Sequence, residues 1–409
     1  MKLTLDPANG LIDDVPSFNV QGLSAGSAVA LTIVTTDAAG HGWQSSGEYL
    51  VDESGWLNVR GDQPWWNMQY TDTSTAPMAF VAPESFLDYE VTITNGAASD
   101  TVVTRRTWGH GTSNDRLDQR WLLRSFSPGE SDTPRPGVLI VPGSTGVAAV
   151  SPLAALVASH GYESAVLAYM QEDGLPENFQ QIPIEAIRDG IASFMAQPEV
   201  DSAHVTVLAQ SVGTAAALSA LTLDDAPAVH SVILVAPSHV VWQALGKAGP
   251  PPKVSSLTKD GTDLPWVPIR GEKLVGQMLR HSVSGKLSRH PRSSALTMID
   301  AYRGGLGDDE AVRKAGIAVE EIAAPMLIIA GLEDAMWPSA DMAKAIYERR
   351  GSRDGDDLLL LPEAGHFLRP PATPSTVDRN ESLVSGGTPT GIAAGQRSAW
   401  TAVLEFLQR

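Results

Sequence analysis

The sequence predicts an α/β fold in which a mostly parallel sheet, covered by helices on both faces, follows an all-β domain. Three observations support this prediction. After residue 136, continuous apolar runs alternate with helical patterns, as in a parallel sheet buried on both faces. Before residue 109, short runs of alternating polarity recur between turn clusters, which indicates an antiparallel β-sandwich. Residues 237–322 contain no such apolar run, and so long a stretch predicts a cap or insertion over a site.

Composition narrows the class of protein. The 409 residues contain no cysteine, which rules out disulfides, Cys-ligated metal sites and a thiol nucleophile. The net charge of −18 argues against nucleic-acid partners and anionic membrane surfaces, which attract proteins rich in Lys and Arg. The N-terminus has no apolar segment of signal-peptide length, and no run is long enough to span a membrane. We therefore expect a cytoplasmic protein, and the composition implies no metal.

Residues 1–108 are predicted to form an immunoglobulin-like β-sandwich. Five tryptophans fall in this segment, and core packing is a simpler role for them than a carbohydrate-binding platform. The predicted strands are Val29–Thr35, Gly47–Val51, Gly55–Val59, Phe80–Ala82, Tyr89–Asn95 and Thr101–Thr107.

Residues 109–136 are predicted to be a linker with one strand of the second domain, Gln119–Phe126. The second domain then occupies residues 137–409. Its predicted strands are Gly137–Val141, Ser164–Tyr169, His204–Leu208, Ser231–Val235, Met326–Ile329 and Leu358–Leu361. Its predicted helices are Pro152–His160, Ile184–Ala196, Val212–Leu221 and Ser398–Leu407.

Ser211 is the candidate nucleophile. It follows the strand His204–Leu208, precedes a predicted helix and lies between small residues, in the order Ala209-Gln-Ser-Val-Gly213. The pattern G-x-S-x-G is typical of a strained strand–turn–helix that exposes a serine hydroxyl. The first glycine of that pattern is replaced here by Ala209. A serine between small residues is weak evidence alone, and the strand and helix around it strengthen the prediction.

An acid and a histidine follow two later strands. Asp334 comes after Met326–Ile329 in Gly331-Leu-Glu-Asp, and we prefer it to Glu333 because it is the fourth residue of G-x-x-D. His366 follows the last predicted strand. Functional residues of open α/β sheets gather beyond the carboxyl ends of the strands. The order Ser, Asp, His is that of α/β-hydrolases and predicts a catalytic triad.

The chemistry of such a triad assigns further roles. His366 would accept the Ser211 proton, and Asp334 would orient the imidazole and stabilise its charged form. An oxyanion needs backbone N–H donors. We expect one donor from Val212, directly after the nucleophile. The other is expected from Ser144, in the loop Pro142-Gly-Ser-Thr-Gly that follows the first parallel strand.

These features resemble the acyl-CoA thioesterase and bile acid-CoA:amino acid N-acyltransferase family over nearly the whole chain. The resemblance begins in the segment Asp14–Leu31. It continues with Leu167-Ala-Tyr, Leu175-Pro, Pro198-Glu-Val and the serine turn. The most specific matches are Gly365-His-Phe-Leu-Arg-Pro-Pro, Ser385-Gly-Gly-Thr-Pro and Ala399-Trp. The chain departs from the family at Ala209, in the loop after the first parallel strand, and in the longer 237–322 region.

The resemblance implies an α/β-hydrolase with an N-terminal β-sandwich, acting on acyl-CoA through an acyl-enzyme. It implies Ser211 as nucleophile, Asp334 as acid and His366 as base. Family members with serine at the nucleophile position are mainly thioesterases, whereas those with cysteine transfer the acyl group to an amine such as glycine or taurine. Ser211 and the absence of cysteine therefore favour hydrolysis. Coenzyme A would be part of the substrate and product, and the resemblance implies no other cofactor.

Residues 266–296 carry six basic side chains and one acidic one, on a chain that is acidic overall. They could contact the phosphates of coenzyme A or of a phosphopantetheine carrier. A solvated helix face is the simpler interpretation. The basic residues are Arg270, Lys273, Arg280, Lys286, Arg289 and Arg292.

Three hypotheses for the function stay open from the sequence. The first is an acyl-CoA thioesterase, with a variant in which a carboxylesterase or polyketide-tailoring hydrolase uses the long insertion to recognise a bulky substrate without CoA. The second is an acyltransferase that uses the same triad with an amine or alcohol acceptor. The third is a non-catalytic binding or scaffold protein with a hydrolase fold, which the complete set of Ser, Asp and His disfavours. The sequence does not indicate an oligomeric state.

Overall fold

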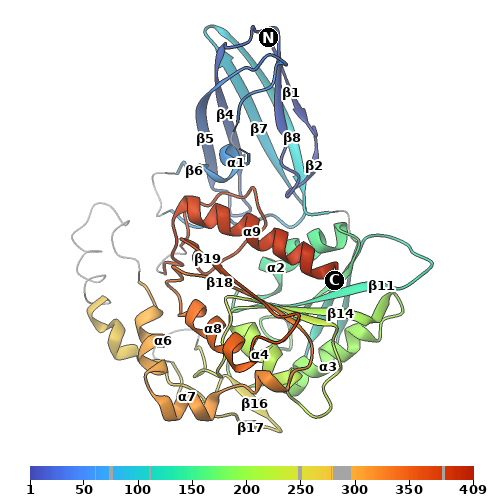
Figure 1. Cartoon of the computed structure of the whole chain (residues 1–409), viewed down its shortest axis with the longest axis vertical. Helices are drawn as coiled ribbons and strands as arrows, with labels where there is room; N and C mark the ends of the chain where they lie inside the picture. Colours follow the sequence, from blue (N-terminus) through green and yellow to red (C-terminus); the bar gives the residue numbers. More distant parts are fainter. Residues whose placement is uncertain are drawn as a thin grey trace.

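A computed structural model describes the chain except for residues 60, 73–76, 110–111, 247–250, 278, 280–295 and 380–382. Figure 1 shows a β-sandwich resting on one side of an α/β domain, with helices α2 (Gly146–Ser159) and α9 (Pro389–Leu407) between the sandwich and the central sheet. The α/β fold predicted from the sequence is confirmed. Among the described residues, no helix has both the length and the apolar character to cross a bilayer.

The sandwich consists of a six-stranded sheet and a two-stranded sheet that share one core. Trp43, Trp65 and Trp108 are each 2% exposed or less in this core, in keeping with the structural role expected for them. The two-stranded sheet is β1 (Lys2–Asp6) and β3 (Ser17–Gln21). The six-stranded sheet is β2 (Gly10–Leu11), β8 (Ala98–Thr107), β7 (Phe86–Asn95), β4 (Ala28–Thr36), β5 (Gly42–Leu50) and β6 (Gln69–Tyr70), and helix α1 (Gln63–Trp66) lies between β5 and β6 in sequence.

The central sheet has eight strands, of which six are parallel. In spatial order they are β19 (Asp357–Leu361), β18 (Met326–Gly331), β15 (Ser231–Val235), β14 (Val200–Gln210), β11 (Arg135–Val141), β12 (Glu163–Ala168), β10 (Leu122–Ser127) and β9 (Thr112–Leu117). The last two are antiparallel to their neighbours. Because the parallel strands run the same way, their carboxyl ends meet at one edge of the sheet.

Both faces of this sheet are buried by helices. On β11, Leu139 and Val141 face the layer formed by α3 (Ile184–Met195), α4 (Val212–Leu221) and α8 (Ser339–Arg349). Val138 and Ile140 point the other way, into a core that includes α2, α9 and the sandwich. Alternate residues of a strand point to opposite faces, so an uninterrupted apolar run is what a doubly covered strand requires.

Residues 109–136 contain two strands where the sequence predicted one. Strand β9 has the sequence Thr-Ser-Asn-Asp-Arg-Leu and lies at the edge of the sheet. An edge strand has one sheet neighbour and commonly carries charged residues, so hydrophobic alternation does not reveal it. Arg124 of β10 lies opposite Asp115 of β9, and its guanidinium donates two hydrogen bonds of 3.0 Å to that carboxylate.

Helix α9 begins nine residues before the predicted start at Ser398. The Thr388 hydroxyl accepts a hydrogen bond from the Gly391 amide, and Pro389 occupies the first turn. Both are good helix-start signals, but Gly391 and Gly395 weaken the helical pattern. Their role is steric, because a Cβ at Gly391 would lie 2.3 Å from the Glu363 side chain. The first turn of α9 therefore packs directly against the loop after β19.

The described residues of the region 237–322 form small elements beside the sheet, and their buried apolar side chains join the core of the sheet. Strand β13 (Ile182–Pro183) pairs with β16 (Leu257–Lys259), which pairs with β17 (Thr262–Asp263). The other described elements of the region are η1 (Gly271–Leu274), α6 (Ile299–Leu306), α7 (Asp309–Ala315) and η3 (Val319–Glu321).

A buried ion pair ties the end of α8 to the start of β18. The Arg350 and Asp356 side chains are fully buried, and the guanidinium donates to both carboxylate oxygens. The Met326 amide donates to the same carboxylate. Arg350 also donates to the carbonyls of Val319, Ile322 and Ala324. This network fixes the entry of β18, the strand that ends just before Asp334.

We expect Arg350→Met to lower the free energy of unfolding by about 3–5 kcal/mol, because it leaves Asp356 as an uncompensated buried charge. Urea unfolding followed by tryptophan fluorescence measures the change. Arg349→Met is the matched control, since the pair of Arg349 with Glu320 is about 40% exposed. It should cost less than about 1 kcal/mol. Equal losses of stability in both variants would contradict the structural role of Arg350.

Candidate active site

Ser211 lies on a sharp turn between β14 and α4. Its backbone has φ of 51° and ψ of −127°, a strained conformation for a residue with a side chain. The turn is held from one side by the Ser211 amide, which donates to the Val235 carbonyl at 2.9 Å. The strand–turn–helix predicted around this serine is present, and the methyl group of Ala209 is fully buried where the usual pattern has glycine.

Two glycines allow the close approach that this turn needs. A Cβ on Gly213 would lie 2.3 Å from the Pro142 carbonyl oxygen. A Cβ on Gly143 would lie 2.9 Å from the Ser211 Cβ. Real Cβ atoms do not approach other heavy atoms this closely without displacement. The loop after β11 and the start of α4 are therefore in direct contact around Ser211.

Asp334 follows β18 and is 3% exposed. One carboxylate oxygen accepts the amides of Met336 at 2.8 Å and Trp337 at 3.1 Å. The other accepts the Ser339 hydroxyl at 2.6 Å and lies 2.7 Å from His366 Nδ1. Four donors thus fix this carboxylate in one orientation. Sequence reasoning missed Ser339, since a serine at the start of a helix usually indicates only a cap.

His366 connects the acid and the serine. Its Nδ1 lies 2.7 Å from Asp334 Oδ2, and its Nε2 lies 2.9 Å from Ser211 Oγ. A carboxylate can only accept, so Nδ1 carries the proton and Nε2 is free to accept from the serine hydroxyl. The structure thus brings together the three residues predicted from the sequence. Glu333, the other candidate acid, is exposed.

A segment that sequence reasoning assigned no role joins the acid loop to the histidine loop. The Ser385 carbonyl accepts hydrogen bonds from the amides of Ala335 and His366, each at 3.0 Å. Gly386, with φ of 91°, has no room for a side chain, because a Cβ there would lie 1.9 Å from the Glu333 carbonyl oxygen. The run Ser385-Gly-Gly could have indicated this segment from the sequence. The sequence analysis used it only as a motif of the family resemblance.

Aromatic rings cover the buried side of the Asp334–His366 pair. The rings of Trp337 and His366 meet edge-on with centroids 5.7 Å apart, and Trp337 meets Tyr302 in the same way at 5.7 Å. Tyr302 meets Trp242 at 4.8 Å. Burial raises the pKa of Tyr302, and the nearby Asp334 carboxylate raises it further. The region 237–322 therefore supplies Tyr302, which packs against Trp337 beside the pair, and Trp242, which packs behind Tyr302.

The two predicted oxyanion donors directly follow Ser211 and Gly143 in the sequence, and their role stays a prediction. Val212 is the first residue of α4, where backbone N–H groups have no partner within the helix. Ser144 is exposed in the loop whose Gly143 contacts Ser211. The Gln171 side-chain amide donates to the Ser144 carbonyl at 3.1 Å, which orients that part of the loop.

A cavity of about 800 Å³ adjoins this loop. The buried side chains of Met170 and Phe179 and the half-buried Leu245 supply its apolar lining. Glu172, Asp173 and Glu177 also line it, and they make part of its rim acidic. The cavity thus has an apolar part near Ser144, and its lining includes none of the triad residues.

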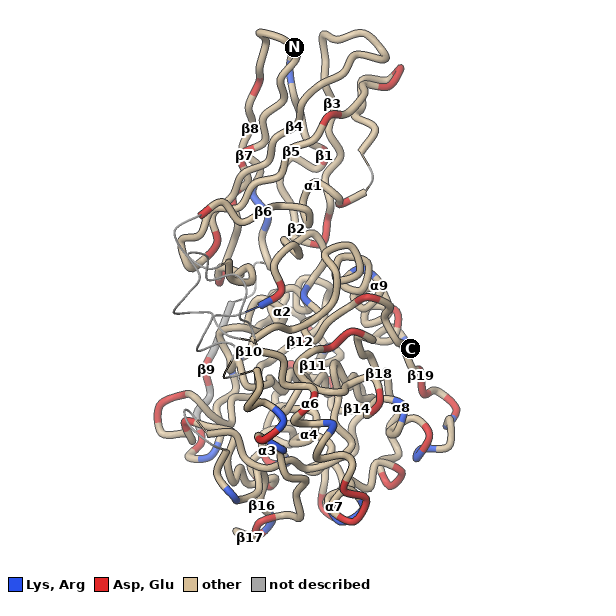
Figure 2. Tube along the Cα trace, turned by 90° about the vertical axis from the view of Figure 1, so that its left-hand side faces the viewer, with Lys and Arg blue, Asp and Glu red and all other residues tan. Residues whose placement is uncertain are grey.

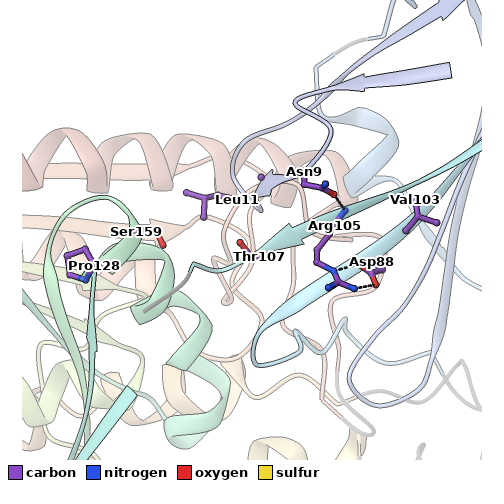
Figure 3. A pocket seen from close by; sticks show the side chains of 9 residues that line it. Asn9, Leu11, Asp88, Val103, Arg105, Thr107, Pro128 and Ser159 are labelled. Atoms are coloured by element: carbon purple, nitrogen blue, oxygen red, sulfur yellow. Dashed lines mark hydrogen bonds and ion pairs between the residues drawn. The ribbon is translucent and has the colours of Figure 1, made fainter. Parts of the chain in front are cut away.

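A second cavity, of about 840 Å³, lies at the junction of the two domains (Figure 3). Leu11, Thr107, Pro128 and Ser159 line it, together with Arg105, whose guanidinium donates two hydrogen bonds of 2.7 Å to Asp88. Its lining includes none of the triad or oxyanion candidates. No group of three His, Asp or Glu side chains in the described part of the chain could hold a metal.

The predicted basic cluster is described only in part. Arg270 forms an ion pair with Asp308 at 3.1 Å, and Lys273 is exposed on η1. Figure 2 shows acidic and basic positions close together around α7, where Lys314 pairs with Glu310 at 2.6 Å. Arg280, Lys286, Arg289 and Arg292 lie outside the described residues. Phosphate contact by this cluster stays a prediction.

Known proteins are similar in sequence to this chain over its whole length. Mouse acyl-coenzyme A thioesterase 6 is 23% identical over 100% of this chain and 96% of its own length. Mouse bile acid-CoA:amino acid N-acyltransferase is 22% identical over 100% of this chain and 97% of its own. A solved α/β hydrolase from Penicillium is 15% identical and covers 73% of this chain and 98% of its own, with a TM-score of 0.43.

A family model described as the C-terminal domain of BAAT and acyl-CoA thioester hydrolases matches residues 182–409, more than half of the chain. The matched segment contains Ser211, Asp334, His366 and Ser385. The family resemblance noted in the sequence is thereby confirmed, and the chain belongs to the BAAT / acyl-CoA thioester hydrolase family.

Proposed function

We propose that this protein is a serine hydrolase that cleaves acyl-CoA with water to give the free acid and CoA. The observation that carries the proposal is the hydrogen-bonded series from Asp334 through His366 to Ser211, at 2.7 and 2.9 Å. These distances suit a general base that removes the serine proton. The full-length similarity to acyl-CoA thioesterases supports the thioester as substrate.

In the first half of the reaction, Ser211 Oγ attacks the thioester carbonyl while its proton moves to His366 Nε2. The carbonyl oxygen becomes an oxyanion, which the N–H groups of Val212 and Ser144 would stabilise. The intermediate collapses, the C–S bond breaks, and the CoA sulfur leaves with the proton from His366. Asp334 holds the imidazole in the required tautomer and stabilises its charged form.

In the second half, water attacks the Ser211 ester. His366 takes a proton from this water and returns it to Ser211 Oγ, and the free acid leaves. An amine or alcohol in place of water would give an acyltransferase, the activity that the name of one relative states. The serine nucleophile and the absence of cysteine in the sequence favour hydrolysis.

The cavity beside Ser144 supports a binding mode in which the acyl chain and the nucleotide end of the substrate occupy different places. Its apolar floor of Met170, Phe179 and Leu245 suits an acyl chain. Its acidic rim would repel the phosphates of coenzyme A. The nucleotide end of the substrate would therefore extend away from this cavity while the acyl chain enters it.

The Ser211→Ala variant should lose at least about 10³-fold in kcat for CoA release, because it removes the hydroxyl that would form the acyl-enzyme. CoA release is measured with a thiol reagent on short, medium and long acyl-CoA esters, with and without glycine and taurine. Mass spectrometry identifies the product. Ser202→Ala, an exposed serine near the start of the same strand, is the matched control.

Free acid as the product supports hydrolysis, whereas an acyl-amide would assign the chain to the acyltransferase branch. Turnover of simple aryl esters without any release of CoA would overturn the thioester substrate and leave the triad intact. Wild-type turnover by Ser211→Ala would overturn the triad itself.

Asp334→Asn should lower kcat by about 10³–10⁴-fold with little change in the urea midpoint, because an amide cannot hold Nδ1 in the protonated tautomer. The neighbouring Glu333→Gln is the control, since that side chain is exposed. Steady-state kinetics of both variants on the best acyl-CoA ester provide the comparison. A larger loss in Glu333→Gln than in Asp334→Asn would show that the acid is assigned to the wrong residue.

A further inference from the structure

The chain that follows His366 runs back to the β-sandwich. We call residues 371–379 the strap. The Ser375 amide donates to the Trp66 carbonyl at 3.0 Å, and the Thr376 hydroxyl donates to the Met68 carbonyl. From the sandwich side, the Ala79 amide donates to the Arg379 carbonyl at 2.7 Å. These hydrogen bonds fasten the strap to the N-terminal domain.

The strap in turn holds the segment that joins the acid and histidine loops. The Ser385 amide donates to the carbonyl of Asp378 at 3.0 Å. The Ser385 carbonyl receives the amides of Ala335 and His366. A continuous series of hydrogen-bonded and covalently linked groups therefore leads from the sandwich to the backbone of the candidate base.

Side chains strengthen the contact between strap and histidine loop. The Asp378 side chain is 6% exposed and lies 3.8 Å from the Arg369 guanidinium. A Cβ at Gly365 would lie 2.9 Å from the Asp378 carboxylate. The Ser375 hydroxyl donates to the Pro389 carbonyl at 2.9 Å, at the start of α9. The strap is thus packed on both sides, and a shift of the strap would move the loop that carries His366.

The sandwich is a fixed base for the strap because other contacts hold it to the catalytic domain. Asp62 pairs with Arg397 of α9. Asp13 lies 2.7 Å from His160 Nε2 and accepts the Trp400 indole N–H at 2.8 Å. The apolar core of the sandwich is continuous with the core beneath α2 and α9. Figure 1 shows the sandwich seated over these two helices.

We infer that the N-terminal β-sandwich positions the catalytic base, with Thr376 and the strap carrying the constraint to His366 through Ser385. This inference rests on the proposed function only in that His366 serves as the base for Ser211. Triad chemistry requires the base within a few tenths of an ångström of its working position. The sandwich is then a part of the catalytic apparatus, although none of its described residues hydrogen-bonds to Ser211, Asp334 or His366.

The test compares three single variants and one double variant of the full-length protein. Thr376→Val removes the hydroxyl that binds the Met68 carbonyl and keeps the shape of the side chain. Thr376→Ser restores the hydroxyl. Thr35→Val is the matched control, because the Thr35 hydroxyl donates to the Asp88 carbonyl inside the sandwich, away from the strap. The double variant Thr376→Val with Ala79→Pro removes two of the hydrogen bonds described above between the strap and the sandwich.

Two readouts separate positioning from general stability. The first is kcat and KM on the best acyl-CoA ester. The second is the rate at which a fluorophosphonate labels Ser211, a reaction in which Oγ forms a P–O bond, fluoride leaves and His366 accepts the proton. Labelling needs an activated serine but no thioester. If the wild-type protein is labelled but releases no CoA, the proposed function is overturned. The labelling rates of the variants still test this inference.

We expect Thr376→Val to lower kcat and the labelling rate about fivefold with KM unchanged, the effect of losing one hydrogen bond. The double variant should lose about 20-fold or more, and Thr376→Ser should recover to within about twofold of wild type. Thr35→Val should lower the melting temperature and keep wild-type kcat. Wild-type rates in the folded double variant would overturn the inference. Parallel losses in Thr35→Val and Thr376→Val would also overturn it, since they indicate stability alone.

Discussion

The parallel hydrogen bonding of β14, β15, β18 and β19 is the constraint on which the rest of the site depends. Their register brings the carboxyl ends of four strands to one edge, so Ser211, Asp334 and His366 meet although 155 residues separate the serine from the histidine. The strain at Ser211 is sustained because Gly143 and Gly213 let two loops touch. Because the register of the sheet is fixed, three loops that are distant in sequence lie side by side, and their side chains form one hydrogen-bonded series.

The loops themselves are held by backbone contacts that involve few side chains. Ser385 offers one carbonyl to two amides, and the glycines beside it leave room for the neighbouring loops. Helix α9 packs against the histidine loop through Gly391 and Gly395. These contacts extend to the β-sandwich by way of residues 371–379. The two domains share a continuous core on that side of the sheet, which makes the sandwich a support rather than an appended module.

Prediction from the sequence succeeded where a strong local pattern exists. The fully apolar strands were found because both faces of the sheet are buried, and α4 was predicted with its observed bounds, Val212–Leu221. Strand β9 was missed because an edge strand has no apolar requirement, and α8 was missed because its pattern is only weakly hydrophobic. The start of α9 was missed because its glycines serve packing rather than helix propensity. The hydroxyl of Ser339 on Asp334 has no sequence signal at all.

The sequence by itself determined the class of fold, which follows from the pattern of apolar runs, and the three candidate residues of the triad, which follow from residue type and position at the ends of strands. Its motifs indicated the family by resemblance. Only the tertiary structure decided how these residues are oriented. It paired Asp334 rather than Glu333 with His366, packed Trp337 and Tyr302 beside this pair, and linked residues 375–379 to the sandwich. Such contacts depend on backbone atoms and on chain segments far apart in sequence. Local patterns of hydrophobicity and charge in the sequence therefore do not predict these contacts.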